Sequence, residues 1–409
     1  MKPFDLDYVR SQFPAFSEPS LDGFAFFENA GGSYACRQVT DSLERFYRET
    51  KVQPYAAYPA SAEARDLMDS AKKRLAAWLN VGDDELHFGP STSMNSYVLA
   101  QALRQEFSPG DEVIVTNQDH EANVGAWSRL EDEGIVVREW KVDTRTAELD
   151  PAELEALLNE RTRAVAFTHC SNIVGTINPV RDIVDLVHEA GALAIVDGVS
   201  FCPHGLPDIS ALGADVYLLS LYKVYGPHLG AMYIRRGLNA ELPYQGHFFN
   251  AGNPGQRFTP AGPDHAQIAA VNGVVDYMEA LHDHHFAQAG GPGNKAAAVR
   301  TLIRDRETEL LQPLLDYLAG HEKTRLVGKT RAGDRAPTVS FTANGVNSQH
   351  IASELTNFNI GAGAGHFYAY RLIEALGLDL EDGVVRVSFV HYTSPEDIQH
   401  LIDALDSIL

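Results

Sequence analysis

The chain has 409 residues, of which 44% are hydrophobic and 22% are charged, a composition typical of a globular protein with room for two domains. Asp and Glu number 55 against 33 Lys and Arg, and the net charge of −22 argues against nucleic acid and membrane surfaces as partners, because both attract basic proteins. Three scattered cysteines indicate neither disulfides nor a metal site, and we find no signal-peptide core or bilayer-length apolar run, so we expect a cytoplasmic protein without metal.

The first half of the chain predicts alternating strands and helices. Residues 1–25 predict a short helix and an arm, and apolar residues from Leu67 to Trp78 then recur at helical spacing. The predicted strands are 86–88, 112–116, 134–140, 163–169, 192–197 and 215–220, and the predicted helices are 93–106, 120–133, 180–190 and one beginning at Asp150. Because these strands are almost continuously apolar, the pattern predicts an α/β fold with a mostly parallel sheet covered by helices on both faces.

The second half of the chain has a different pattern. Residues 244–265 are rich in Gly, Pro, Asn and Phe and predict a shaped loop, and 281–295 predict a second irregular stretch. Strands at 337–341 and 384–389 then alternate with helices, the last of which is capped at Ser394. We therefore predict an N-terminal arm at 1–25 that packs with a small domain, a large domain at 26–270 and a smaller α+β domain at 271–409.

Lys223 is the most informative residue for function. It stands in an apolar and aromatic segment, with Ser220 before it and glycines after it. Such surroundings lower the pKa of an amine and prepare it to attack a carbonyl, although a lysine at a strand end can also extend its head group to water. Ser220 and Asp197 both end predicted strands, where parallel sheets bind their ligands.

Three further segments allow two interpretations each. The turn 89–93 suits a phosphate at a helix N-terminus, but it also suits an ordinary helix cap. His120 can stack on a flat ligand or cap the helix that follows. Asp197 can cap the next turn, or it can pair with a cation such as a protonated ring nitrogen, because a buried carboxylate needs a partner.

Taken in order, these segments resemble the class V aminotransferase family, and within it the cysteine desulfurase-like branch. The resemblance extends from 27–32 to 391–394, and its most specific parts are Ser171-Asn172-x-x-Gly175-Thr176-Ile177-Asn178-Pro179, Val196-Asp197-Gly198 and Ser220-x-x-Lys223-x-x-Gly226-Pro227. It implies a fold-type-I enzyme with a seven-stranded sheet, pyridoxal 5'-phosphate as cofactor and an amino acid as substrate. It also implies a homodimer whose active sites lie near the subunit interface.

The resemblance implies a role for each matching residue. Lys223 matches the Schiff-base lysine, Asp197 the partner of the pyridinium nitrogen, and His120 the histidine stacked on the ring. The other expected cofactor contacts are Asn172 and His204 near the phenolic oxygen, Tyr222 beside the lysine, and Ser91, Thr92, Ser93 and Ser220 around the phosphate. The expected substrate contacts are Arg386, which matches the arginine that grips the α-carboxylate, and Asn29, Ala30, Gly31, His366 and Tyr368.

Two departures from the family narrow the expected function. Segment 359–370, where cysteine desulfurases carry a nucleophilic cysteine, contains none, and Tyr368 stands at or near that position. Gly262, in loop 258–265, takes the place of a threonine that commonly contacts the phosphate of a neighbouring subunit. We therefore predict a C–S lyase that acts by β-elimination without a persulfide. The alternatives are a class V aminotransferase, an amino-acid epimerase and a non-catalytic relative that binds the cofactor.

Overall fold

The structure is a computed structural model that describes residues 2–287 and 289–409. Within these residues, seven strands form one sheet in the order β2-β8-β7-β6-β5-β3-β4. Six of them run in one direction, and only β8 is antiparallel to both of its neighbours, which confirms the mostly parallel α/β sheet. The strands are β2 (Leu86–Gly89), β3 (Glu112–Thr116), β4 (Val136–Trp140), β5 (Thr162–Thr168), β6 (Leu193–Asp197), β7 (Val216–Ser220) and β8 (Gly230–Ile234).

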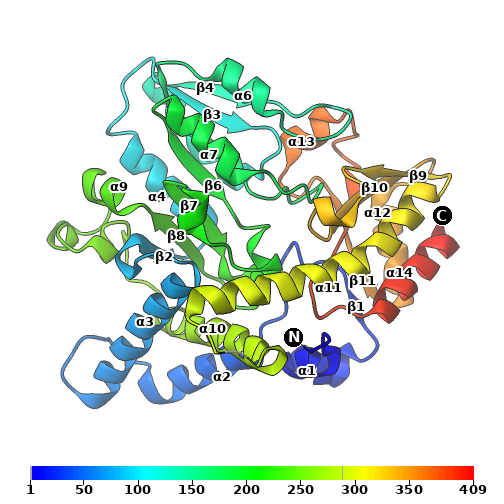
Figure 1. Cartoon of the computed structure of the whole chain (residues 1–409), viewed down its shortest axis with the longest axis horizontal. Helices are drawn as coiled ribbons and strands as arrows, with labels where there is room; N and C mark the ends of the chain where they lie inside the picture. The colour runs from blue at the N-terminus through cyan, green and yellow to red at the C-terminus, as the bar shows by residue number, and fades with distance from the viewer. Residues whose placement is uncertain (1, 288) are drawn as a thin grey trace.

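Alternate residues of the central strands face two separate cores. In β7, Val216 and Leu218 lie in one core, and Tyr217 and Leu219 lie in the other. Figure 1 shows the helices that surround the sheet. The first core is covered by α4 (Thr92–Leu103), α5 (Gly125–Ser128) and α9 (Arg236–Glu241), and the second by α2 (Arg37–Arg45), α3 (Pro59–Trp78), α6 (Pro151–Leu157), α7 (Val180–Glu189), α8 (Ile209–Leu212) and α10 (His265–His285).

A second lobe, at the right of Figure 1, is built around an antiparallel sheet. Four strands of the described chain form it in the order β12-β13-β10-β9. Its strands are β9 (Thr324–Val327), β10 (Thr338–Ala343), β12 (Gly363–Gly365) and β13 (Val384–Ser388), and its helices are α12 (Ser348–Leu355) and α14 (Pro395–Ile408). The short α13 (Tyr370–Ala375) instead packs into the core of the large lobe. The short β1 (Ala25–Phe26) joins this lobe, because it pairs in parallel with β11 (Ile360–Gly361).

One long helix connects the two lobes. The first half of α11 (Pro292–Gly320) packs into the core beneath the large sheet, whereas its second half packs into the core of the small sheet. The predicted boundary between residues 270 and 271 falls inside α10, a continuous helix that packs against α2 and α3. We therefore propose that the division between the lobes lies within α11. The N-terminal arm carries α1 (Leu6–Ser11) and contacts the C-terminal segment, where Arg10 binds Asp397.

The segment predicted as one helix at 120–133 is instead broken into short turns and α5. Polar side chains satisfy the backbone and each other locally: Nδ1 of His120 accepts the Ala122 N–H at 3.0 Å, and Asn123 donates its amide to Asp119 at 2.8 Å. Such local hydrogen bonds compete with a regular helix. No helix in the described ranges is long and apolar enough to span a membrane.

Candidate active site

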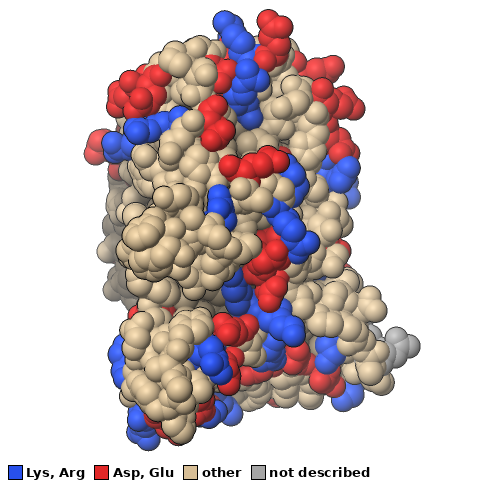
Figure 2. All heavy atoms as spheres, turned by 90° about the vertical axis from the view of Figure 1, so that its left-hand side faces the viewer, with Lys and Arg blue, Asp and Glu red and all other residues tan. Residues whose placement is uncertain are grey.

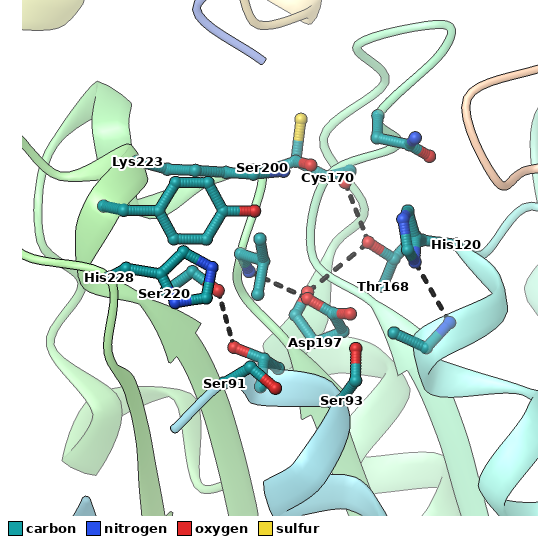
Figure 3. A pocket seen from close by; sticks show the side chains of 15 residues that line it. Ser91, Ser93, His120, Thr168, Cys170, Asp197, Ser200, Ser220, Lys223 and His228 are labelled. Atoms are coloured by element: carbon teal, nitrogen blue, oxygen red, sulfur yellow. Dashed lines mark hydrogen bonds between the residues drawn. The ribbon is translucent and has the colours of Figure 1, made fainter. Parts of the chain in front are cut away.

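Lys223 lies at the carboxyl end of the large sheet, on the wall of a cavity. β7 ends at Ser220, and the 3-10 turn Leu221–Lys223 follows it directly. The Lys223 side chain is buried, and Figure 3 shows it at the edge of the cavity. Burial first, and then the charge of Arg386, lower the pKa of Lys223 to about 8, although Asp197 raises it. At pH 7 about a tenth of the amine is therefore neutral and nucleophilic, far more than for an unperturbed lysine.

Asp197 lies in the same cavity at the end of the neighbouring strand β6. Its Oδ1 accepts the Val199 N–H at 2.8 Å. Burial raises the pKa of Asp197, whereas this hydrogen bond and the charge of Lys223 lower it. A buried carboxylate of this kind is stabilised by a cation bound against it, and a protonated ring nitrogen would serve.

The N-terminus of α4 forms one end of the cavity. Ser91 caps this helix by accepting the Met94 N–H at 3.2 Å, and Thr92 Oγ1 lies 2.6 Å from Ser220 Oγ. Gly230 allows this close approach, because a Cβ there would lie 2.4 Å from the Ser91 carbonyl carbon. Ser93 completes the hydroxyl group cluster (Figure 3). The backbone N–H groups and hydroxyls at this helix end suit a phosphate.

His120 and Asn172 line the cavity on the side of β3 and β5. Burial first, and then Lys223 and Arg386, lower the pKa of His120 to about 4, so the ring is neutral at pH 7 and suits stacking on a flat ligand. Asn172 donates its amide to the Phe367 carbonyl at 2.9 Å. Its Oδ1 is buried and has no hydrogen-bond partner within residues 2–287 and 289–409. The cavity therefore offers an unused polar atom to a ligand.

The arrangement fits pyridoxal phosphate. The α4 terminus suits its phosphate, the buried Asp197 carboxylate suits a cationic ring nitrogen, and the Lys223 amine suits its aldehyde. The individual contacts of these residues with the cofactor stay predictions. The structure shows that residues from five separate segments of the chain meet around one cavity.

Arg386 lies on β13 of the smaller lobe and is buried. Its Nη1 donates to the Asn172 carbonyl at 3.1 Å, its Nη2 binds the Glu28 carboxylate, and its guanidinium carbon lies 3.7 Å from the centroid of the Phe367 ring. The charge of Arg386 lowers the pKa of both Lys223 and His120, so it lies within electrostatic range of the cavity. This position suits a grip on a substrate carboxylate.

Asn29, Ala30 and His204 line a second, smaller cavity that shares Lys223 with the first. The Asn29 side chain donates to the carbonyls of Phe26 and Ser388 and accepts from Tyr392, so it braces this turn. His204 does not reach the main cavity, because its Nδ1 lies 3.0 Å from both oxygens of the buried Glu307. Gly31 leaves room for the Glu28 carboxylate.

Segment 359–370, which contains no cysteine, contacts His120 through Tyr368. Tyr368 is 68% exposed, and its ring centroid lies 5.1 Å from that of His120. His366 accepts the Tyr368 N–H at 3.2 Å through Nδ1, and neither side chain lines the main cavity. Cys170 does line it, but burial raises the pKa of its thiol to about 12. This thiol therefore stays protonated and is a poor nucleophile.

Several lining residues were not anticipated from the sequence. Thr168, Cys170, Ser200 and His228 all face the cavity with the predicted residues (Figure 3). Ser200 follows Asp197 by three positions, and that spacing at a strand end was a usable signal. His228 stacks on the predicted Tyr222, with ring centroids 4.8 Å apart, and only the fold shows this contact.

The chain is similar to known proteins in sequence and in fold. The sequence model of the class V aminotransferase family matches residues 25–289 and 296–401. The chain is 38% identical to the aminotransferase-like protein FGM3 of Gibberella zeae, over 99% of both chains. It is 30% identical to the cysteine desulfurase-like protein ustD of Aspergillus flavus, over 99% of this chain and 91% of that one. The fold matches apo cysteine desulfurase from Thermococcus onnurineus with a TM-score of 0.87 at 21% identity, over 100% and 99% of the two chains.

Proposed function

The chain belongs to the class V aminotransferase family and is a pyridoxal-phosphate enzyme, and we propose that it cleaves the C–S bond of cysteine or a cysteine conjugate by β-elimination. One observation carries this choice: Lys223 and Asp197 line the cavity within electrostatic range of Arg386, but segment 359–370 has no cysteine to accept sulfur. The relatives named aminotransferase-like and cysteine desulfurase-like support an amino-acid substrate.

Each residue has a proposed task in this reaction. Bound pyridoxal phosphate supplies an electron sink for the electron pair left at Cα. Asp197 keeps the ring nitrogen protonated, and Arg386 orients the substrate through its α-carboxylate. Lys223 Nζ takes the proton from Cα. The electron pair at Cα forms a Cα=Cβ bond while the Cβ–S bond breaks with its own pair moving to sulfur, and the Lys223 ammonium then protonates the leaving thiolate. Proton removal and return by one positioned amine match general acid–base catalysis.

Transamination is the second candidate, and the 38% identity with an aminotransferase-like protein over the whole chain favours it. It uses the same contacts up to the removal of the Cα proton by Lys223, but no bond would then break at Cβ, and the amino group would pass to a keto acid. The two reactions differ in their products. Elimination from cysteine gives pyruvate, ammonia and sulfide from one substrate, whereas transamination needs a second amino or keto acid.

We also propose a homodimer that is located in the cytoplasm. Tyr244, Phe248 and Phe249 are exposed after α9, and loop 258–265 lines an apolar groove against β2 and α4. Figure 2 shows this side of the molecule with broad areas free of charged side chains. Such apolar surface favours burial against a second subunit. The three cysteines are free and buried, which suits a reducing compartment.

The first test uses the absorbance of the purified protein. We expect a bound-cofactor band in the wild type, a shift of this band in Lys223→Ala, and release of pyruvate and sulfide from L-cysteine by the wild type but not by Lys223→Ala. Lys72→Ala is the matched control, because Lys72 is another lysine whose pKa is lowered by burial but lies on α3 outside the cavity. Keto-acid exchange without sulfide would replace the lyase by a transaminase, and a colourless wild type that takes up no cofactor would refute the whole proposal.

A further inference from the structure

The partner that Arg386 binds is itself a carboxylate. Glu28 follows β1, and its Oε1 binds Nη2 of Arg386 across 358 positions of sequence. Nη1 is engaged by the Asn172 carbonyl, and the ring of Phe367 covers the guanidinium. Both terminal nitrogens of the fork are thus in use. A carboxylate arriving from a substrate meets an arginine that already holds one.

The chain leaves space for the Glu28 carboxylate on two sides. A Cβ on Gly31 would lie 2.8 Å from Oε1, and a Cβ on Gly363 would lie 2.8 Å from Oε2. Oε2 is buried and has no hydrogen-bond partner in the described part of the chain. The carboxylate therefore fits sterically, but only one of its two oxygens is hydrogen-bonded. Moving it out of this position costs less free energy than moving a fully hydrogen-bonded carboxylate.

The two partners differ in their freedom to move. The Arg386 side chain is 4% exposed, whereas the Glu28 side chain is 29% exposed. Glu28 can swing toward solvent and keep its charge hydrated, but Arg386 is enclosed on β13 between its neighbours. When a second carboxylate enters, the glutamate is thus the group that yields.

We propose that Glu28 is a specificity-determining residue that holds the place of the substrate α-carboxylate on Arg386 and must be displaced before an amino acid binds. This inference rests on the proposed role of Arg386. Glu28 keeps the buried guanidinium neutralised in the empty site, so it admits only ligands whose carboxylate competes successfully with its own. If Glu28 only braced Arg386, its presence would strengthen amino-acid binding and its removal would weaken it.

Binding of an unreactive amino acid to the holoenzyme separates the two roles. 2-Methylalanine has no Cα proton, so its binding can be titrated through cofactor absorbance without turnover. We expect Glu28→Gln and Glu28→Ala to lower its Kd at least about 10-fold. If Glu28 occupies Arg386 in ~90% of wild-type molecules, only ~10% can bind the ligand, and the apparent affinity is about 10-fold lower. Glu121→Gln is the control: it removes the same charge from a residue beside His120 that pairs with Arg371 instead of Arg386. Unchanged or weaker binding in both Glu28 variants would overturn the proposal.

A second readout is independent of amino-acid binding. Sodium formate should raise the Tm of the Glu28→Ala holoenzyme more than sodium chloride at equal ionic strength, because formate can fill the vacated position on Arg386. The wild type and the Glu28→Ala/Arg386→Gln double variant should show no such excess. Absence of a formate-specific rise in Glu28→Ala would count against Glu28 as a place holder. If 2-methylalanine changes the spectrum of no variant, the proposed amino-acid site fails, and the formate result alone decides the Glu28–Arg386 competition.

Discussion

Replacing Lys223 by methionine is expected to stabilise the cofactor-free protein. In that protein the ammonium of Lys223 is buried at the carboxyl end of β7, and burial first, then Arg386, lowers its pKa from 10.5 to about 8. The folded state thus disfavours the charged amine that the unfolded chain carries freely. A lowering of this size corresponds to about 3 kcal/mol of lost stability at pH 7. Methionine has a similar length and no charge, so it removes this penalty.

The sign of the pH dependence follows from the two pKa values. Below pH 8 the amine is charged in both states, and the full penalty of about 3 kcal/mol applies. Between pH 8 and 10.5 the folded protein has lost the proton and the unfolded chain still holds it, so wild-type stability rises with pH relative to the variant. The difference should fall to about 1 kcal/mol at pH 10.

Urea unfolding of the cofactor-free proteins, followed by circular dichroism at pH 7 and pH 10, measures this difference. Lys141→Met is the control, because Lys141 is exposed and its replacement should change the free energy of unfolding by less than about 0.5 kcal/mol. Equal stability of wild type and Lys223→Met at pH 7 would refute the reasoning. So would a difference that stays constant up to pH 10, since it could not come from the Lys223 proton.

Two further predictions concern the chemistry of the site. Asp197→Asn removes the carboxylate proposed to hold the ring nitrogen protonated, and we expect kcat to fall on the order of 100-fold while the cofactor band persists. Steady-state kinetics on the cofactor-loaded enzyme measures this change, and a kcat within a few-fold of the wild type would contradict it. Cys170→Ser should keep sulfide release from cysteine within about 2-fold, because the pKa of this thiol, raised to about 12, leaves it protonated. Mass spectrometry of the working wild-type enzyme should find no persulfide on Cys170, and a labelled persulfide there would show a sulfur acceptor that we exclude.

The local sequence was sufficient to predict six strands of the large sheet and the residues at their ends, but it missed β8. Apolar runs predicted β5, β6 and β7 to within about two residues. Asp197 ends β6 and Lys223 lies just after β7, and the two share one cavity because parallel strands end at the same edge of a sheet. The family resemblance was a poorer guide for His204, which it implied to lie near the phenolic oxygen but which does not line the main cavity. The turn Cys202–His204 directs that ring to Glu307 on α11, a contact across 103 positions.

Contacts between the lobes were beyond local pattern. Residues 25–26 belong to the smaller lobe only because they pair with 360–361, and no periodicity near either segment encodes that pairing. Glu28 was similarly unremarkable in the sequence, since its partner Arg386 lies 358 positions away. Likewise, the apolar pattern of α11 shows a buried helix but does not show that its two halves serve different cores.

That division of α11 has a consequence for how the protein comes apart. The helix is about 43 Å long, and it is also tied to the segment after Asp197, where Arg300 donates to the Leu206 carbonyl at 2.7 Å and Glu307 holds His204. Loosening either core frays a helix on which the other depends, so neither lobe is an independent unit of unfolding. The two lobes are distinct in architecture, yet they should melt as one cooperative body, with the cofactor cavity lost at the same moment as the fold.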